Sequence, residues 1–156
     1  ERFDFSSGVG AWSTELKIAA DGTFTALYHD AKAGEGGEGY TATIYTCQFY
    51  GEFSAPVKVN DYTYSMTLES LHLVDEAGQE TIDSDGTRWV TSTPYGLEGA
   101  DEVLIYLPGA PVAELPEEFV HWTQGIFWNW DDPERAALPR YGLYNVQEGL
   151  GFAGVG

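Results

Sequence analysis

The sequence is short of the residues that several kinds of chemistry require. Its 156 residues include one cysteine, three histidines and seven lysines and arginines, against 25 acidic residues. The single cysteine, Cys47, excludes an internal disulfide and a thiolate metal cluster. Because the formal net charge of −18 repels phosphate backbones and anionic membrane surfaces, we expect no nucleic-acid partner.

Long apolar runs and catalytic signatures are missing as well. No apolar segment has the length that a membrane span needs, and no Gly-x-Ser-x-Gly elbow is present. The glycine-rich segment 33–39 carries glutamates where a phosphate-binding loop needs amide donors and a lysine. Its composition predicts a mobile acidic loop instead. With 25 acids, some pair meets the spacing of a glycosidase by chance. No constellation of residues specifies a reaction, so we expect a protein that is not an enzyme.

A two-residue alternation is the clearest pattern that the sequence does contain. Trp12, Thr14, Leu16 and Ile18 share one face of an extended segment, with polar residues between them. The dipeptide Asp21-Gly22 follows and precedes a second alternating run, which predicts a β-hairpin.

Similar signals recur along the chain at the spacing of an all-β domain. They predict strands over 40–53, 61–69, 88–91, 103–107 and 141–146, and a short helix over 115–122. A second helical turn is expected at Asp132-Pro133-Glu134. The sequence therefore predicts one domain over 1–156, an antiparallel β-barrel of about eight strands with a short helix near the C-terminus. A β-sandwich is the alternative, and residues 1–9 are expected to be the end of a linker.

Gly10-Ala11-Trp12 at the start of the first alternating strand resembles the calycins, the family of lipocalin-like and avidin-like barrels. The resemblance implies a barrel whose floor is closed by Trp12 and whose mouth holds a small ligand.

Six stretches carry a second resemblance, namely 10–16, 21–24, 61–66, 94–97, 106–111 and 141–145. They resemble a group of uncharacterised secreted or lipid-anchored surface proteins of Gram-positive bacteria. The resemblance implies an extracytoplasmic domain, secreted or anchored to the cell surface through a lipidated segment upstream.

Aromatic side chains are the candidate ligand-binding residues. Large aromatics bury area in small β domains, but exposed ones also form platforms for apolar molecules and sugar rings. In an extended segment Trp128 and Trp130 would point to the same side. Both core packing and ligand contact are open for this set, which comprises Tyr62, Tyr64, Trp89, Trp122, Trp128 and Trp130.

Asp83 and Asp85 are the candidate metal ligands. With Gly86 they resemble the first half of a calcium loop, although no acid follows until Glu98. The same residues also fit a plain hairpin turn. Calcium is thus the one cofactor that the sequence suggests.

Three functional classes remain. The first is a non-catalytic extracytoplasmic domain that binds a small apolar molecule or a glycan in the barrel mouth. The second is a structural or protein-interaction module of the cell envelope with a filled core. The third is an envelope hydrolase.

Overall fold

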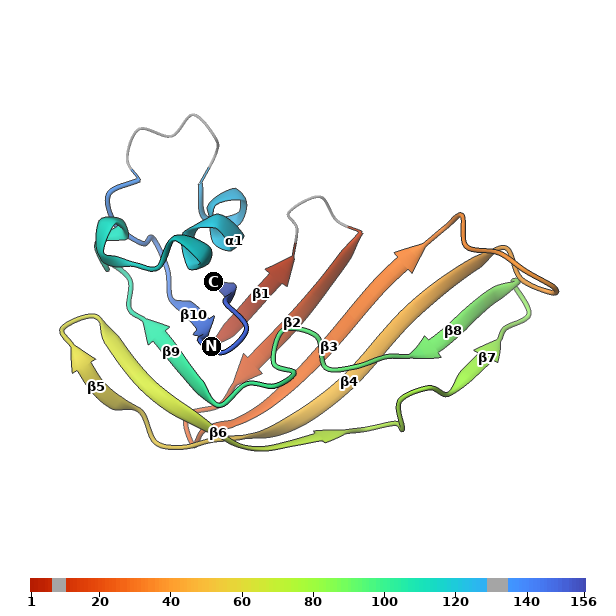
Figure 1. Cartoon of the computed structure of the whole chain (residues 1–156), viewed down its shortest axis with the longest axis horizontal. Helices are drawn as coiled ribbons and strands as arrows, with labels where there is room; N and C mark the ends of the chain where they lie inside the picture. Colours follow the sequence, from red (N-terminus) through yellow and green to blue (C-terminus); the bar gives the residue numbers. More distant parts are fainter. Residues whose placement is uncertain (7–10, 129–134) are drawn as a thin grey trace.

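Eight strands close into an antiparallel barrel (Figure 1). The computed structural model describes residues 1–6, 11–128 and 135–156. Closure occurs where β6 pairs with β4, so no barrel strand lacks a neighbour on either side. This confirms the predicted all-β barrel in place of the sandwich. Its strands are β1 (Arg2–Ser6), β2 (Trp12–Ile18), β3 (Thr23–Lys32), β4 (Ala42–Phe53), β6 (Thr63–Leu73), β9 (Glu102–Tyr106), β10 (Gly142–Asn145) and β11 (Leu150–Val155).

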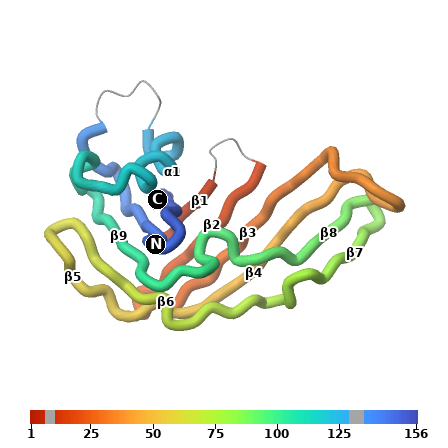
Figure 2. The backbone as a smooth tube through the Cα atoms, viewed as in Figure 1, coloured from red at the N-terminus to blue at the C-terminus, as the bar shows by residue number. Residues whose placement is uncertain are grey.

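Three further strands extend the sheet beyond the barrel. Strand β5 (Val57–Asn60) pairs with β6, while β8 (Thr87–Thr91) runs parallel to the first half of β4 and β7 (Glu80–Ile82) pairs with β8. The ends of β3 and β4 project together with β7 and β8, as the right-hand part of Figure 2 shows. We call this projecting sheet, residues 28–32, 42–47, 80–82 and 87–91, the wing.

The predicted β2–β3 hairpin is confirmed. Gly22 adopts a φ of 91°, which an L side chain rarely takes, and the Asp21 carboxylate accepts hydrogen bonds from the Thr23 amide and hydroxyl. These bonds hold the pKa of Asp21 below its ordinary value. The register that follows, with Leu16 opposite Ala26, turns the apolar face of both strands inward.

Side chains fill the barrel interior. The cluster combines residues from every barrel strand, and aromatic rings meet edge to face or tilted, as Phe24 does with Phe53 at 4.8 Å. Cys47 lies in this cluster, and its burial raises the pKa of the thiol to about 11, as expected of an inert cysteine. The buried members are Phe3, Phe5, Leu16, Phe24, Ala26, Cys47, Phe49, Phe53, Met66, Leu97, Val103, Leu143 and Phe152.

One end of the barrel is closed by the segment 92–101, which we call the plug loop. Leu97 of this loop is buried in the barrel cluster. Two buried polar side chains hold the loop, since the Thr14 hydroxyl donates to the Tyr95 carbonyl and the Asn145 amide donates to the Gly96 carbonyl, each at 2.8 Å. The plug loop is thereby bonded to β2 and to β10.

Helix α1 (Glu117–Phe127) follows a 3-10 turn, η1 (Val112–Glu114), and packs on the outside of the barrel. Its Phe119 lies against Gly142 and Gly151 of β10 and β11, where a Cβ on Gly142 would overlap the ring. A second buried cluster forms there from Phe119, Tyr106, Tyr144 and their neighbours. No helix in the described part of the chain is long and apolar enough to cross a membrane.

Several boundaries differ from the sequence-based expectation. The segment expected to be linker contains β1, because Phe3 and Phe5 both point into the core. The helix begins at Glu117, after the extended Pro116, and continues past Trp122 to Phe127. Residues 150–155, over which no strand was predicted, form β11, where Gly151 leaves room for Phe119 of α1. The expected turn at 132–134 lies outside the described residues.

Gly96→Ala tests the plug loop. Gly96 has a φ of 105°, and an added Cβ would lie 2.7 Å from Phe152 and 3.0 Å from Phe5. We expect the substitution to lower the free energy of unfolding, measured in urea, by about 2 to 4 kcal/mol, from backbone strain and overpacking together. Gly78→Ala is the matched control, since Gly78 has a φ of 92° with open space around it and should cost about 1 kcal/mol. Equal losses in both variants would contradict the packing of the plug loop.

Candidate functional site

The two ends of the barrel differ. At the end that the plug loop closes, the Trp12 ring lies 5.0 Å from Phe5, 5.3 Å from Tyr95 and 6.2 Å from Trp122, measured between ring centroids. Trp122 reaches this floor from α1 and also meets Phe5 at 5.0 Å. Trp12 therefore occupies the floor position that its resemblance to the calycins implies.

The opposite end, at the β2–β3 turn, is open. A pocket of 340 Å³ lies there, in the range of small-molecule sites. Three of its lining residues lie on the interior faces of barrel strands, namely Phe3 on β1, Met66 on β6 and Ile105 on β9. We call this pocket the mouth. It is lined by Glu1, Phe3, Ile18, Ala19, Ala20, Gly22, Pro56, Met66, Ile105 and Tyr141.

The mouth adjoins a second hollow of 680 Å³ on the outer side of the same rim. Three residues line both hollows, namely Glu1, Ile18 and Ala19. Cross-strand neighbours line the outer hollow, since Arg2 pairs with Lys17, Lys17 with Thr25 and Thr25 with Tyr50.

The side chains that line the mouth are suited to binding. They are aliphatic or aromatic, apart from the Glu1 carboxylate and the Tyr141 hydroxyl. Apolar walls act through the hydrophobic effect, which gives about 25 cal/mol for each Å² of apolar surface removed from water. The arrangement can retain an apolar molecule and offers its carboxylate and hydroxyl as orienting groups.

The structure separates the aromatic residues that the sequence singled out. Trp122 lies at the closed floor, while Trp128, 8% exposed, packs in the cluster between α1 and the barrel. Tyr62 packs against that same cluster from outside the barrel, and Tyr64 lies on β6 on the face of Met66. Trp89 is on β8 in the wing and is 40% exposed. These residues do not line one common site, and Trp130 lies outside the described residues.

Asp83 serves as a turn residue in the β7–β8 hairpin. One carboxylate oxygen accepts hydrogen bonds from the amides of Asp85 and Thr87, and the other accepts one from the Trp89 indole at 2.8 Å. The indole and the amides lower the pKa of Asp83 below its ordinary value. Within residues 1–6, 11–128 and 135–156, no three His, Cys, Asp or Glu side chains lie close enough to hold a metal ion. The role of Asp83 and Asp85 in calcium binding stays a prediction.

Sequence reasoning missed most of the mouth. Ile18 and Met66 could be placed on apolar strand faces by alternation, but nothing in their spacing assigns them to the same end of the barrel. Phe3 belonged to the expected linker, and Ala19, Ala20 and Pro56 are unremarkable turn residues. Only the closure of the barrel brings these segments together.

The fold and the pocket define a class, a closed eight-stranded antiparallel barrel with one plugged end and one apolar mouth. This architecture is compatible with a calycin-like fold. Comparison with protein families, with curated proteins and with solved structures finds no match to this chain.

Trp128→Ala distinguishes a core role from a ligand-binding role for that residue. Because the indole is buried against Phe127 at 5.4 Å, we expect the free energy of unfolding to fall by about 3 to 5 kcal/mol. Trp89→Ala, at an exposed indole, should cost less than about 1 kcal/mol in the same urea titration. A Trp128→Ala protein as stable as the wild type would refute the core role.

Alkaline pH should destabilise the protein through its buried tyrosines. Burial and a hydrogen bond to Glu118 at 2.7 Å raise the pKa of Tyr144 to about 12, and burial raises that of Tyr28 to a similar value. A tyrosine in the unfolded chain ionises near pH 10. The stability that these protonated tyrosines contribute is therefore fully present below pH 10 and is lost as the pH rises toward 12. We expect thermal unfolding to move to lower temperature between pH 9.5 and 11.5, and less steeply in Tyr144→Phe. Identical slopes in the two proteins would contradict this.

Proposed function

We propose that this chain is a non-catalytic extracytoplasmic domain that binds a small apolar molecule in the mouth of its barrel. The observation that supports the proposal is the 340 Å³ apolar pocket at the end opposite the plug loop. The extracytoplasmic location, and a lipid anchor on the surface of a Gram-positive cell, rest on the resemblance of the sequence to that group of surface domains.

The shape of the interior favours a shallow ligand over a deeply enclosed one. Phe49, Phe53 and Phe152 are each at most 2% exposed and occupy the barrel below the mouth. A ligand would therefore rest on Phe3 and Met66 and emerge between the β2–β3 turn and Pro56. An apolar ring or a short aliphatic chain meets this geometry without displacing core side chains.

The chemistry of the rim favours an apolar ligand over a sugar at this site. A sugar requires several hydrogen-bonding groups, whereas the walls of the mouth supply one carboxylate and one hydroxyl from side chains. Burial of about 250 Å² of ligand surface yields about 6 kcal/mol before the cost of immobilisation. Because 6 kcal/mol alone corresponds to a dissociation constant of about 40 μM, we expect binding no tighter than this.

The alternative, a protein-interaction module of the envelope, has its own support. The interior is filled, and the edge strand β5 is exposed along its length, with Val57 66% and Val59 59% exposed. Exposed apolar edges are places where another chain can pair.

Binding of N-phenyl-1-naphthylamine, a neutral apolar dye that brightens in apolar surroundings, tests the proposal. We expect saturable enhancement of its fluorescence with the wild-type protein. Ala20→Trp places a large side chain at the exposed rim of the mouth and should weaken binding by about tenfold or more. Ala31→Trp, at an exposed position on the wing, is the matched control and should bind as the wild type does.

Two outcomes would contradict binding in the mouth. One is the absence of saturable enhancement up to the solubility limit of the dye, which would leave the interaction module as the better account. The other is equal affinity in Ala20→Trp and the wild type, which would place the dye elsewhere.

A further inference from the structure

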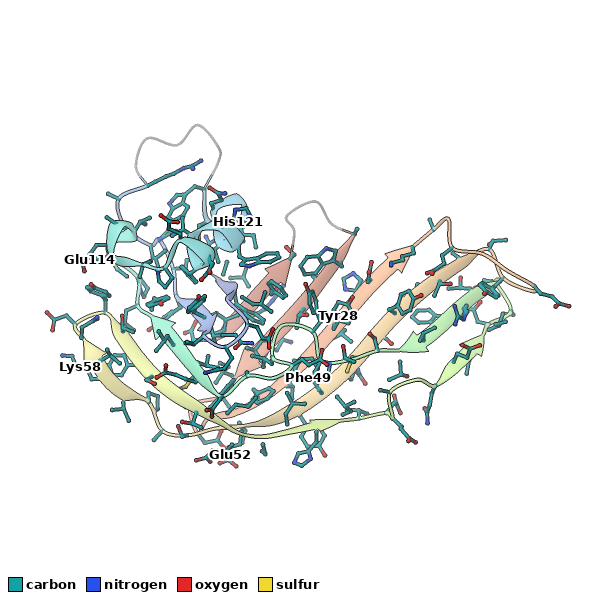
Figure 3. All side chains as sticks on the ribbon, viewed as in Figure 1. Tyr28, Phe49, Glu52, Lys58, Glu114 and His121 are labelled. Atoms are coloured by element: carbon teal, nitrogen blue, oxygen red, sulfur yellow. The ribbon has the colours of Figure 1, made fainter. Side chains whose placement is uncertain are left out.

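We infer that the wing binds a neutral oligosaccharide. The site is its inner face, which carries Tyr28, Asp30 and Tyr45, together with the aromatic floor beside it. This site goes beyond the proposed function, because it lies at the closed end of the barrel and shares no residue with the mouth. In Figure 3 the labelled Tyr28 marks the start of this surface, beside the plug loop.

Aromatic side chains from adjacent strands come to this face in register. Trp12 on β2 pairs with Asp30 on β3, and Asp30 pairs with Tyr45 on β4, so the three side chains form one row across the sheet. Adjacent strands are about 4.8 Å apart, which places Trp12 and Tyr45 about 10 Å apart with a carboxylate between them. The half-buried Tyr28 stands in the next row and contacts Tyr95 at 5.5 Å.

Polar groups surround these rings and fit hydroxyl-bearing ligands. The Tyr45 hydroxyl lies 3.0 Å from the Glu35 carboxylate, and Asp30 lies two residues from Tyr28 on the same face of β3. Carboxylates accept hydrogen bonds from hydroxyl groups, and tyrosine hydroxyls can donate or accept them. Aromatic faces carry negative charge and attract the polarised C–H groups of a sugar ring. Trp12 and Tyr28 thus offer partly exposed aromatic surface beside the Asp30 carboxylate, while Lys32 lies over the Tyr45 ring and Glu35 accepts from its hydroxyl.

The charges on and around the face favour a neutral saccharide. Lys32 lies over the Tyr45 ring at 5.3 Å, and Arg88 pairs with Glu80 at 2.7 Å, so the basic groups of this region already have partners. Asp30 and Glu35 add negative charge to a chain whose net charge is −18. An anionic polysaccharide would be repelled, whereas uncharged hydroxyls would not.

Isothermal titration of the whole chain with hexasaccharides tests the inference. The probes are cellohexaose, chitohexaose and mannohexaose, which are neutral, and hexagalacturonate, which is anionic. We expect at least one neutral probe to bind with a dissociation constant below about 1 mM and the anionic probe to bind more weakly. Failure of all three neutral probes at 10 mM, or preference for hexagalacturonate, would overturn the inference.

Variants on one strand locate the binding. Tyr45→Ala should weaken the binding by about tenfold or more, since it removes the ring and the hydroxyl that border Asp30 in the row. Tyr50→Ala is the matched control, because Tyr50 lies on the opposite face of β4 and is 48% exposed. Asp30→Asn, which preserves shape, provides a second test if Tyr45→Ala does not fold. Equal affinities in the Tyr45→Ala and Tyr50→Ala proteins, or an unchanged affinity in Asp30→Asn, would contradict the inference. Saturating N-phenyl-1-naphthylamine should leave the saccharide affinity unchanged, so this result and the result for the mouth are independent.

Discussion

Two hydrogen bonds from buried side chains hold the loop that closes one end of this barrel. Thr14 and Asn145 donate to consecutive carbonyls of the plug loop and hold it inside the ring of strands. Buried polar groups without partners are costly, so the loop and the two side chains stabilise one another. Leu97 can enter the core, and Tyr95 can meet Trp12 and Phe5, only with the loop in that position. The difference between the two ends of the barrel follows from this constraint.

Glycine residues on two barrel strands let helix α1 pack against the outside of the barrel. Gly142 and Gly151 let Phe119 approach the barrel wall, and α1 then carries Trp122 over the floor. Glu118 of the same helix accepts a hydrogen bond from the Tyr144 hydroxyl, and the helix covers the outer face of β9, β10 and β11. The closed end is therefore built by elements far apart in the sequence, namely β2, the plug loop and α1.

Local sequence patterns predicted the barrel fold but not which residues come together at its sites. Alternation over Trp12–Ile18 and the Asp21-Gly22 turn identified the first hairpin, because period and turn chemistry are properties of neighbouring residues. The parallel pairing of β4 with β8 and the burial of Phe3 depend on long-range contacts that no local pattern encodes. Trp128 and Trp89 could be recognised as large aromatics, but their exposed fractions, 8% and 40%, are decided by tertiary packing. The mouth is likewise a product of closure, since its residues come from segments across the chain.

The central claim, that ligands enter at the end opposite the plug loop, can be tested with one methyl group. Met66 is the only methionine in the sequence and lines the mouth, so selective ¹³C labelling of methionine methyls gives a single resonance there. We predict that N-phenyl-1-naphthylamine shifts this resonance saturably, through the ring current of the bound dye. A Met66 resonance that stays in place while the dye fluorescence saturates would contradict the account.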